Sequence, residues 1–259
     1  MNILACFKLV RDFEQITPTE LSALRDGTLA ISAFKKMFGS YDEAALEHAR
    51  RLAAGRPSAV DCKLDAVTVG DCESRFAKEL YAIGFDQVFQ IGASDNTPSH
   101  PREVAENICR LVEREGGYDA ILTGRQAWPG ESGLTPYFIA KRLGLPCISQ
   151  VIDLNHISSG IRVLSKTDRG TFAQTITVPA VYSMGEAAHP YLQIATLREK
   201  LTVGDRSVLE LDLAQIAQEE NAGKLLGLLY EDTEKQCRFL EGETVEEKAQ
   251  ALWQEMFSQ

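Results

Sequence analysis

Patterns typical of buried strands and of amphipathic helices alternate along roughly the first 150 residues of the chain. Short apolar runs predict strands, and apolar residues spaced three and four apart predict the helices between them. This alternation predicts an α/β fold with a doubly wound, mostly parallel sheet, because successive parallel strands need a crossover connection. The predicted strands are Ile3–Val10, Leu64–Val69, Gln87–Ile91 and Ala120–Thr123. The predicted helices are Glu43–Ala54, Glu73–Ile83, Pro101–Arg114 and Leu134–Leu143.

The pattern changes after the last of these helices. Alternating or apolar runs follow at Cys147–Leu154, Ile161–Ser165, Phe172–Val178 and Ala180–Met184. Turn-forming residues between them predict an antiparallel extension of the sheet. From His189 onward the sequence shows no regular pattern of strands or helices until a last amphipathic helix, Glu243–Phe257.

Composition and charge argue against several classes of function. The apolar fraction of 44% and the charged fraction of 25% are those of an ordinary soluble globular protein. A net charge of -10 makes nucleic acid and anionic membranes poor partners. No apolar run approaches the roughly 20 residues of a membrane-spanning helix, and the N-terminus lacks the basic region of a signal peptide. The six cysteines lack C-x-x-C spacing and the four histidines are scattered, so we expect a cytoplasmic location and no metal site.

The strongest functional pattern lies between Asp119 and Pro146. A short strand leads into a turn that holds Gly124, Gly130 and Gly133, and an amphipathic helix follows. A glycine-rich turn between a strand and a helix presents backbone N–H groups to a phosphate beside the helix N-terminus. The spacing matches neither the Rossmann fingerprint nor a P-loop, so a plain strand–helix turn explains the glycines equally well.

The string GRQAWPGESGLTP, residues 124–136, resembles the G-K-Q-A-x-D-G-D-x-G-Q-x-G loop of electron transfer flavoprotein beta subunits. Other segments resemble the same family in the same order along the chain. They are MNILACFKLVRD, SYDEAALEHARRLA, LDAVTVGDCESRFAKELYAIGFDQVFQI, LPCISQV, TDRGTFAQTITVPAV and the region Tyr191–Leu197. The resemblance covers roughly residues 1 to 200 and indicates a divergent relative of these beta subunits.

In the family that the chain resembles, a nucleotide lies at the carboxyl ends of the parallel strands. The resemblance implies an adenine contact at Cys6, ribose or base contacts at Val69 and Gly70, a cationic contact from Arg125 and an amide contact from Gln126. The loop from Gly124 to Thr135 would cradle the phosphate. The implied nucleotide-binding residues are Cys6, Lys8, Gly39, Asp42, Val69, Gly70, Gly124, Arg125, Gln126, Gly130, Ser132, Gly133, Leu134 and Thr135.

Simpler roles compete for three of these residues. Cys6 is equally explained as a small core residue, because free cysteine is often buried. Asp42, like its neighbour Ser40, is placed to cap the N-terminus of the following helix. Arg125 is also explained as a solvated surface side chain.

The chain departs from the family pattern at several positions. Gly39 and Ser40 stand where the family has Asn-Pro, Pro129 replaces an acidic residue and Leu134 replaces a glutamine. Housekeeping-type beta subunits hold AMP in this site, and electron-bifurcating types hold a second FAD there. The departures leave the choice between AMP and FAD open.

The segment YLQIATLREK resembles the family's recognition loop, in which one leucine anchors a partner dehydrogenase. Ile194 would take that role with Leu197 beside it, although a core-facing strand residue explains Ile194 equally well. The last helix carries Trp253 and Phe257 on one face. It either packs on the chain's own core or, as in the family, forms an arm on an alpha subunit. The resemblance thus implies a nucleotide-binding domain over residues 1–189 and a recognition loop with a partner-binding arm over residues 190–259.

The function implied by the resemblance is that of a beta subunit in a heterodimeric electron transfer flavoprotein. FAD would be shared with the alpha subunit, and electrons would pass between a dehydrogenase and an acceptor. The sequence has no nucleophile elbow, paired carboxylates or Cys–His arrangement, which favours a non-catalytic carrier. The alternative is a standalone nucleotide-binding signalling or stress-type domain, although the Gly-x-x-Gly spacing of such domains is missing here. An adenylating enzyme of this fold would need a different loop after the first strand.

Overall fold

The computed structural model describes residues 1–13, 16–57, 61–92, 100–128, 130–204, 206–212 and 239–257. The chain divides into two compact units, Met1–Leu225 and Leu226–Gln259. The first unit extends past the boundary expected after residue 189. Leu192 and Ala195 lie in its core, and Leu209–Leu211 forms a strand of its sheet. Packing of residues 190–259 on a partner remains a prediction.

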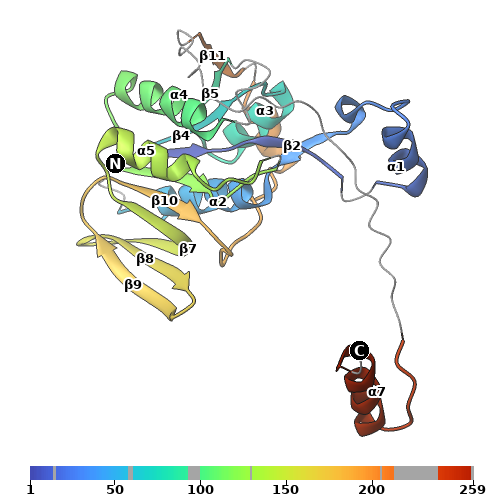
Figure 1. Cartoon of the computed structure of the whole chain (residues 1–259). Coiled ribbons are helices and arrows are strands. Elements are labelled where there is room, and N and C mark those ends of the chain that lie inside the picture. The colour runs from blue at the N-terminus through green and yellow to red at the C-terminus, as the bar shows by residue number, and fades with distance from the viewer. Residues whose placement is uncertain are drawn as a thin grey trace. The chain divides into compact units, whose positions relative to one another are not determined.

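Nine strands within the described residues form one sheet, in the order β11-β5-β4-β1-β6-β10-β7-β8-β9 (Figure 1). Every pairing from β11 to β7 is parallel, whereas β8 and β9 continue the sheet in antiparallel fashion. Two short strands, β2 and β3, form a separate antiparallel ribbon. The strands are β1 (Asn2–Cys6), β2 (Leu9–Arg11), β3 (Lys36–Phe38), β4 (Lys63–Val69), β5 (Gln87–Ile91), β6 (Ala120–Gly124), β7 (Cys147–Ile157), β8 (Gly160–Thr167), β9 (Gly170–Ile176), β10 (Ala180–Met184) and β11 (Leu209–Leu211).

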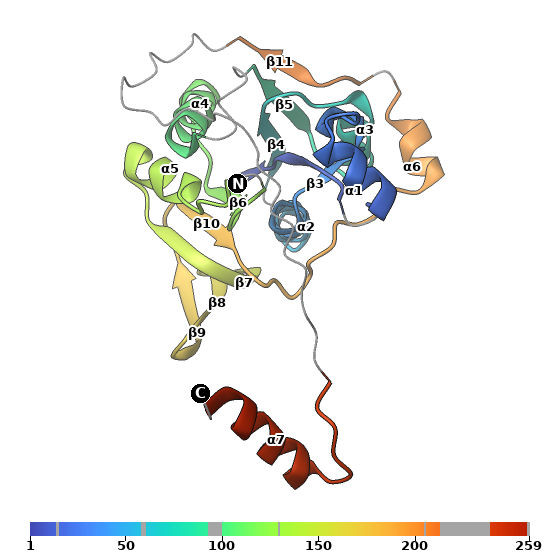
Figure 2. The ribbon, with the colours of Figure 1, turned by 45° about the vertical axis from the view of Figure 1, so that its right-hand side comes forward.

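Helices cover both faces of the sheet, which confirms the doubly wound arrangement. Figure 2 shows α4 and α5 on one side of the sheet and α2 and α3 on the other. Side chains of β1 alternate between these layers: Ile3 and Ala5 join the core under α2 and α3, and Leu4 and Cys6 join the core under α4 and α5. The helices are α1 (Pro18–Arg25), α2 (Ser40–Ala54), α3 (Ser74–Ala82), α4 (Pro101–Arg114), α5 (Thr135–Leu143), α6 (Leu197–Thr202) and α7 (Val245–Phe257), with a short 3-10 turn at Ile31–Ala33. None of the described helices has the length and apolar content required to cross a bilayer.

Strand β10 corrects one expectation from the sequence. Ala180–Met184 was expected to extend the antiparallel strands, but β10 lies within the parallel part of the sheet, between β6 and β7. All five of its residues are buried, because helices and neighbouring strands cover it on both faces. Position in the sequence after the antiparallel runs was a poor guide to the pairing partner.

The strand predicted over Ile3–Val10 is in fact two strands. β1 ends at Cys6, and β2 turns away to pair with β3. Phe7 still donates its N–H to the Val67 carbonyl at 2.9 Å, but the Lys8 N–H is donated to the Asp42 carboxylate at 3.0 Å. A side-chain acceptor from α2 therefore replaces the next strand partner, which the apolar pattern alone does not reveal.

A buried ionic network lies at the amino-terminal edge of the parallel strands. The Asp65 side chain is fully buried, and burial raises its pKa even though neighbouring groups stabilise the charge. The Tyr118 hydroxyl donates to Asp65 at 2.6 Å, and the Lys63 ammonium lies 2.9 Å from both Asp65 and Glu115. A buried carboxylate needs such partners, because an unpaired one costs several kcal/mol.

Replacing Tyr118 with Phe is expected to lower the free energy of unfolding by about 1–3 kcal/mol, because Asp65 keeps its burial and loses a donor. Urea unfolding followed by circular dichroism measures the loss. Tyr137→Phe is the matched control, since the Tyr137 side chain is 47% exposed and the same atom is removed. Equal losses in the two variants would contradict the role given to the Tyr118 hydroxyl.

Candidate functional site

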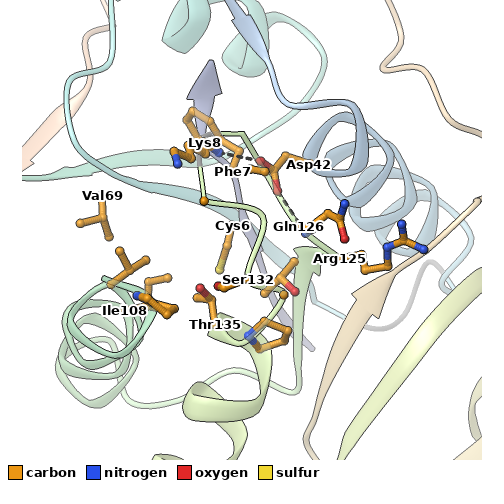
Figure 3. A pocket seen from close by; sticks show the side chains of 18 of the residues that line it. Cys6, Phe7, Lys8, Asp42, Val69, Ile108, Arg125, Gln126, Ser132 and Thr135 are labelled. Atoms are coloured by element: carbon orange, nitrogen blue, oxygen red, sulfur yellow. Dashed lines mark hydrogen bonds between the residues drawn. The ribbon is translucent and has the colours of Figure 1, made fainter. Parts of the chain in front are cut away.

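An open cleft lies at the carboxyl ends of β1, β4 and β6, between the N-terminal ends of α4 and α5 (Figure 3). Ligands of open α/β sheets bind at this edge of the strands. The cleft is open, and its empty space of about 780 Å³ includes solvent at the mouth. This position makes the cleft the candidate nucleotide site.

Most of the site residues named from the sequence line this one cleft. They are Cys6, Lys8, Asp42, Val69, Gly124, Arg125, Gln126, Gly130, Ser132, Gly133 and Thr135. The other three, Gly39, Gly70 and Leu134, do not line it. The structure thus gathers residues that are more than 100 positions apart in the sequence. Their contacts with a ligand remain predictions.

An apolar wall of the cleft was missed in the sequence. Val104 and Ile108 project from the first turns of α4, and Val67 from β4 faces the same space. The signal was present, because Val104 and Ile108 stand four residues apart on the inner face of an amphipathic helix. Phe7, Ala127 and Glu131 also line the cleft and belong to segments expected at the site, whereas the lining residues Pro101, Thr123 and Pro136 were not anticipated.

Asp42 does not cap a helix, contrary to one interpretation of the sequence. The N-cap of α2 is Gly39, no side chain caps it in the described structure, and Ser40 is the first helical residue. The Asp42 carboxylate instead accepts the N–H of Lys8 at 3.0 Å and the N–H of Gly124 at 3.2 Å. Lys8 lies just after β1, and Gly124 is the last residue of β6. The buried Asp42 side chain therefore joins two strand ends beneath the cleft (Figure 3).

The protonation of Asp42 reflects this position. Burial raises its pKa from 3.8 to about 7, against the opposing effect of the hydrogen bonds from Lys8 and Gly124 and of the Lys8 charge. Burial also lowers the pKa of Lys8, while the Asp42 charge acts in the other direction. The carboxyl group therefore titrates near neutral pH, although its partners favour the charged form.

Gly124 is required by this contact. A Cβ at position 124 would lie 2.8 Å from the backbone nitrogen of Asp42 and 2.9 Å from the carbonyl carbon of Tyr41, closer than carbon atoms pack. The end of β6 therefore contacts the first turn of α2 directly. In the sequence this glycine looked like a turn former, and the structure shows that it serves close packing.

The loop between β6 and α5 curls over the cleft. Gly130 and Gly133 have φ of 103° and 65°, and Glu131 has φ of 40°, so three of its described residues are left-handed. Pro129 lies outside the described residues. In the described structure no side chain caps α5, and its first residues, Thr135 and Pro136, line the cleft. The Leu134 N–H is donated to the Ser132 hydroxyl at 3.4 Å and Pro136 has no N–H, so the first turn offers an anion its remaining N–H groups and the positive end of the helix dipole.

Arg125 is oriented differently from the expectation of a phosphate contact. Its guanidinium stands over the Tyr41 ring at 4.7 Å and, in Figure 3, points away from Cys6 and Ser132. It also borders a neighbouring hollow lined by Gln150 and other residues of the antiparallel strands. The competing interpretation of a freely solvated arginine is also incomplete, because the side chain is partly buried against Tyr41.

The segment proposed as a recognition loop exposes its large apolar residues. Ile194 is 80% exposed and Leu197 is 75% exposed, so the alternative of a core-facing strand residue at Ile194 is wrong. Tyr191 and Leu201 are exposed to a similar extent. In the second unit, the rings of Trp253 and Phe257 lie 4.5 Å apart on an exposed face of α7.

The family model and the relatives found by comparison with known proteins agree with one another. Residues 28–199 match the family model described as "Electron transfer flavoprotein domain". The chain is 28% identical to "Putative electron transfer flavoprotein subunit YgcR" of Escherichia coli (strain K12), across 100% of this chain and 98% of the relative. It is 27% identical to "Electron transfer flavoprotein subunit beta" of Megasphaera elsdenii, across 85% of this chain and 81% of the relative. It is 25% identical to "Protein FixA" of Azorhizobium caulinodans, across 73% and 67%.

The Asp42 pKa predicts a specific pH dependence of stability. Between about pH 4 and pH 7 the folded chain holds a proton on Asp42 that the unfolded chain has lost, because the folded pKa is near 7 and the ordinary value is 3.8. Stability therefore falls as pH rises through this window, by up to about 1.4 kcal/mol per pH unit, and this contribution levels off above it.

Asp42→Asn is expected to remove this contribution. Urea unfolding of both proteins from about pH 4 to pH 8 should give a difference in unfolding free energy that shifts in favour of the variant up to about pH 7. Other titrating groups are common to both proteins and cancel in the difference. A difference that does not change with pH would contradict the assignment.

Proposed function

The chain belongs to the electron transfer flavoprotein domain family, and on that basis we propose that it is the beta subunit of a heterodimeric electron transfer flavoprotein. In this role it binds an adenine nucleotide, AMP or FAD, and helps enclose an FAD held together with the alpha subunit. It passes electrons between a dehydrogenase and an acceptor in the cytoplasm. The proposal follows the names of the relatives "Electron transfer flavoprotein subunit beta" and "Protein FixA".

The observation that carries the proposal is the pairing of an apolar wall with an uncapped helix N-terminus in one cleft. Val69, Val104 and Ile108 offer an apolar surface on which an adenine ring can pack. The first turn of α5, with the Ser132 and Thr135 side chains beside it, offers donors to a phosphate. A base at one side and a phosphate at the other match the chemistry of an adenine nucleotide.

The residues of the chain bind and orient in this function, and a bound flavin supplies the redox chemistry. Asp42 and Gly124 fix the spacing of β1, β6 and α2 under the nucleotide. Arg125 contributes its backbone to the loop, while its guanidinium stacks on Tyr41. No side chain is assigned a catalytic role, and we propose a carrier subunit rather than an enzyme.

Two exposed apolar surfaces are proposed for partners. Tyr191, Ile194 and Leu197 form the docking surface for the dehydrogenase. The apolar face of α7, which includes Trp253 and Phe257, buries against the alpha subunit. Exposed apolar groups of this size commonly mark interaction sites.

Nucleotide stoichiometry tests the proposal. The chain would be co-expressed with an electron transfer flavoprotein alpha subunit from the same organism, and FAD and AMP would be extracted and quantified per heterodimer. One FAD with one AMP supports a simple carrier, and two FAD support AMP replacement by a second flavin. A stable monomer that binds adenine nucleotide but no alpha subunit would support the standalone nucleotide-binding domain.

Gly124→Ala is expected to lower the nucleotide content of the purified heterodimer at least about tenfold, because the added methyl group forces α2 and β6 apart. Nucleotide extraction and isothermal titration with AMP measure the effect. Gly92→Ala is the control, since a Cβ there meets no atom within 4 Å. Unchanged AMP content in Gly124→Ala would argue against the close contact as a requirement for binding.

Ile194→Asp is expected to raise the KM of the heterodimer for its dehydrogenase by about tenfold or more, because a charge replaces the apolar anchor of the docking surface. The rate of flavin reduction at varied concentrations of heterodimer measures KM and kcat. Val178→Asp places the same charge at another exposed aliphatic residue, 55% exposed, and is expected to change KM little. Equal effects of the two substitutions would exclude Ile194 as a specific anchor.

A further inference from the structure

The loop that exposes Ile194 is anchored on both sides by buried side chains. Leu192 is 7% exposed and Ala195 is 5% exposed, and both belong to the core under α2 and α3. Tyr191 and Ile194, in contrast, are 78% and 80% exposed. The backbone between Leu192 and Ala195 must therefore hold a fixed conformation for Ile194 to stand away from the protein surface.

A single carboxylate from α2 holds that backbone. The Glu47 Oε2 atom accepts the N–H of Gln193 at 3.1 Å. The same carboxylate accepts two guanidinium bonds from Arg50, at 2.7 Å and 3.0 Å. Glu47 is only 5% exposed, so water competes weakly for these bonds.

Glu47 is ionised at neutral pH. Burial alone would raise its pKa, but the bonds from Arg50 and from the Gln193 N–H outweigh burial and place the pKa below its ordinary value. The bond to Gln193 is therefore charge-assisted and stronger than a bond between neutral groups. Arg50 also holds the carboxylate in position, since its two bonds fix the plane of the carboxylate.

We propose that Glu47 is a positioning residue for partner docking, which fixes the loop Tyr191–Thr196 through the Gln193 N–H so that Ile194 is presented to the dehydrogenase. The buried side chains of Leu192 and Ala195 anchor the loop on either side of Ile194, and the Glu47 carboxylate fixes the peptide between them. Glu47 lies one and a half turns after Asp42 on the same helix, so α2 supports both the nucleotide cleft and the docking loop. The identity of the partner rests on the proposed function, whereas the hold on the loop does not.

Hydrogen exchange tests the hold on the loop without any partner. In Glu47→Ala, the amides of the peptide that covers Tyr191–Thr196 are expected to exchange about tenfold faster or more than in the wild type. Glu47→Gln keeps an oxygen that accepts the Gln193 N–H but loses the charge and one of the two Arg50 bonds, so its exchange is expected to lie between that of Glu47→Ala and that of the wild type. Glu210→Gln removes one negative charge from an exposed residue of β11, outside the loop, and is expected to have no effect.

Kinetics with the assembled heterodimer test the consequence for docking. Glu47→Ala is expected to raise KM for the dehydrogenase about three- to tenfold at unchanged kcat, and Glu47→Gln to raise it less. Unchanged exchange in Glu47→Ala, or faster exchange with unchanged KM, overturns the positioning role. If Ile194→Asp also leaves KM unchanged, the docking surface of the proposed function fails, and the positioning role fails with it, even where exchange shows that Glu47 holds the loop.

Discussion

The buried carboxylate of Asp42 is the interaction on which the architecture of the cleft depends. It accepts one N–H just beyond β1 and one at the end of β6, and it comes from the first turn of α2. This geometry explains two other features: β1 stops at Cys6 because the next free N–H is taken by a side chain, and position 124 is glycine because α2 comes too close for a Cβ. Two backbone donors help the Asp42 carboxylate to tolerate such burial. Its pKa of about 7 shows that these donors only partly offset the effect of burial on the charged form.

Local patterns in the sequence predicted the elements whose residues alternate between core and solvent. The helix Pro101–Arg114 and the strand Gln87–Ile91 have the predicted bounds, because periodicity is a local property. Pairing is not local, so β10 was placed beside the wrong strands and the segment Ile3–Val10 was taken as one strand. The segment before β3 also contains α1, which was not predicted although a capping box between Thr17 and Glu20 marks its start.

The residues of the cleft were also predicted where a local sequence pattern marks them, and missed or misassigned where their role depends on distant residues. Residues of the loop 124–135, and also Cys6 and Val69, were named because segments of the chain resemble a known family, and they line the cleft. Val104 and Ile108 were missed because their spacing shows only that they lie on the inner face of α4, and whether that face meets the cleft depends on distant elements. Asp42 and Arg125 were assigned wrong or incomplete roles, since the partners of a side chain depend on distant residues such as Gly124 and on neighbours such as Tyr41.

The position of β10 has a consequence for how the chain folds. Strands β6 and β7 are not neighbours in the sheet, and the strand that joins them comes later in the chain than β7, β8 and β9. During synthesis the edge of β6 thus stays open until the ribosome has released residues 180–184, and the antiparallel strands have no place in the sheet before then. Such late, non-local pairing slows folding and leaves an unpaired edge available for aggregation. Pairing of β10 closes that edge and buries all five of its residues, including the large side chain of Tyr182.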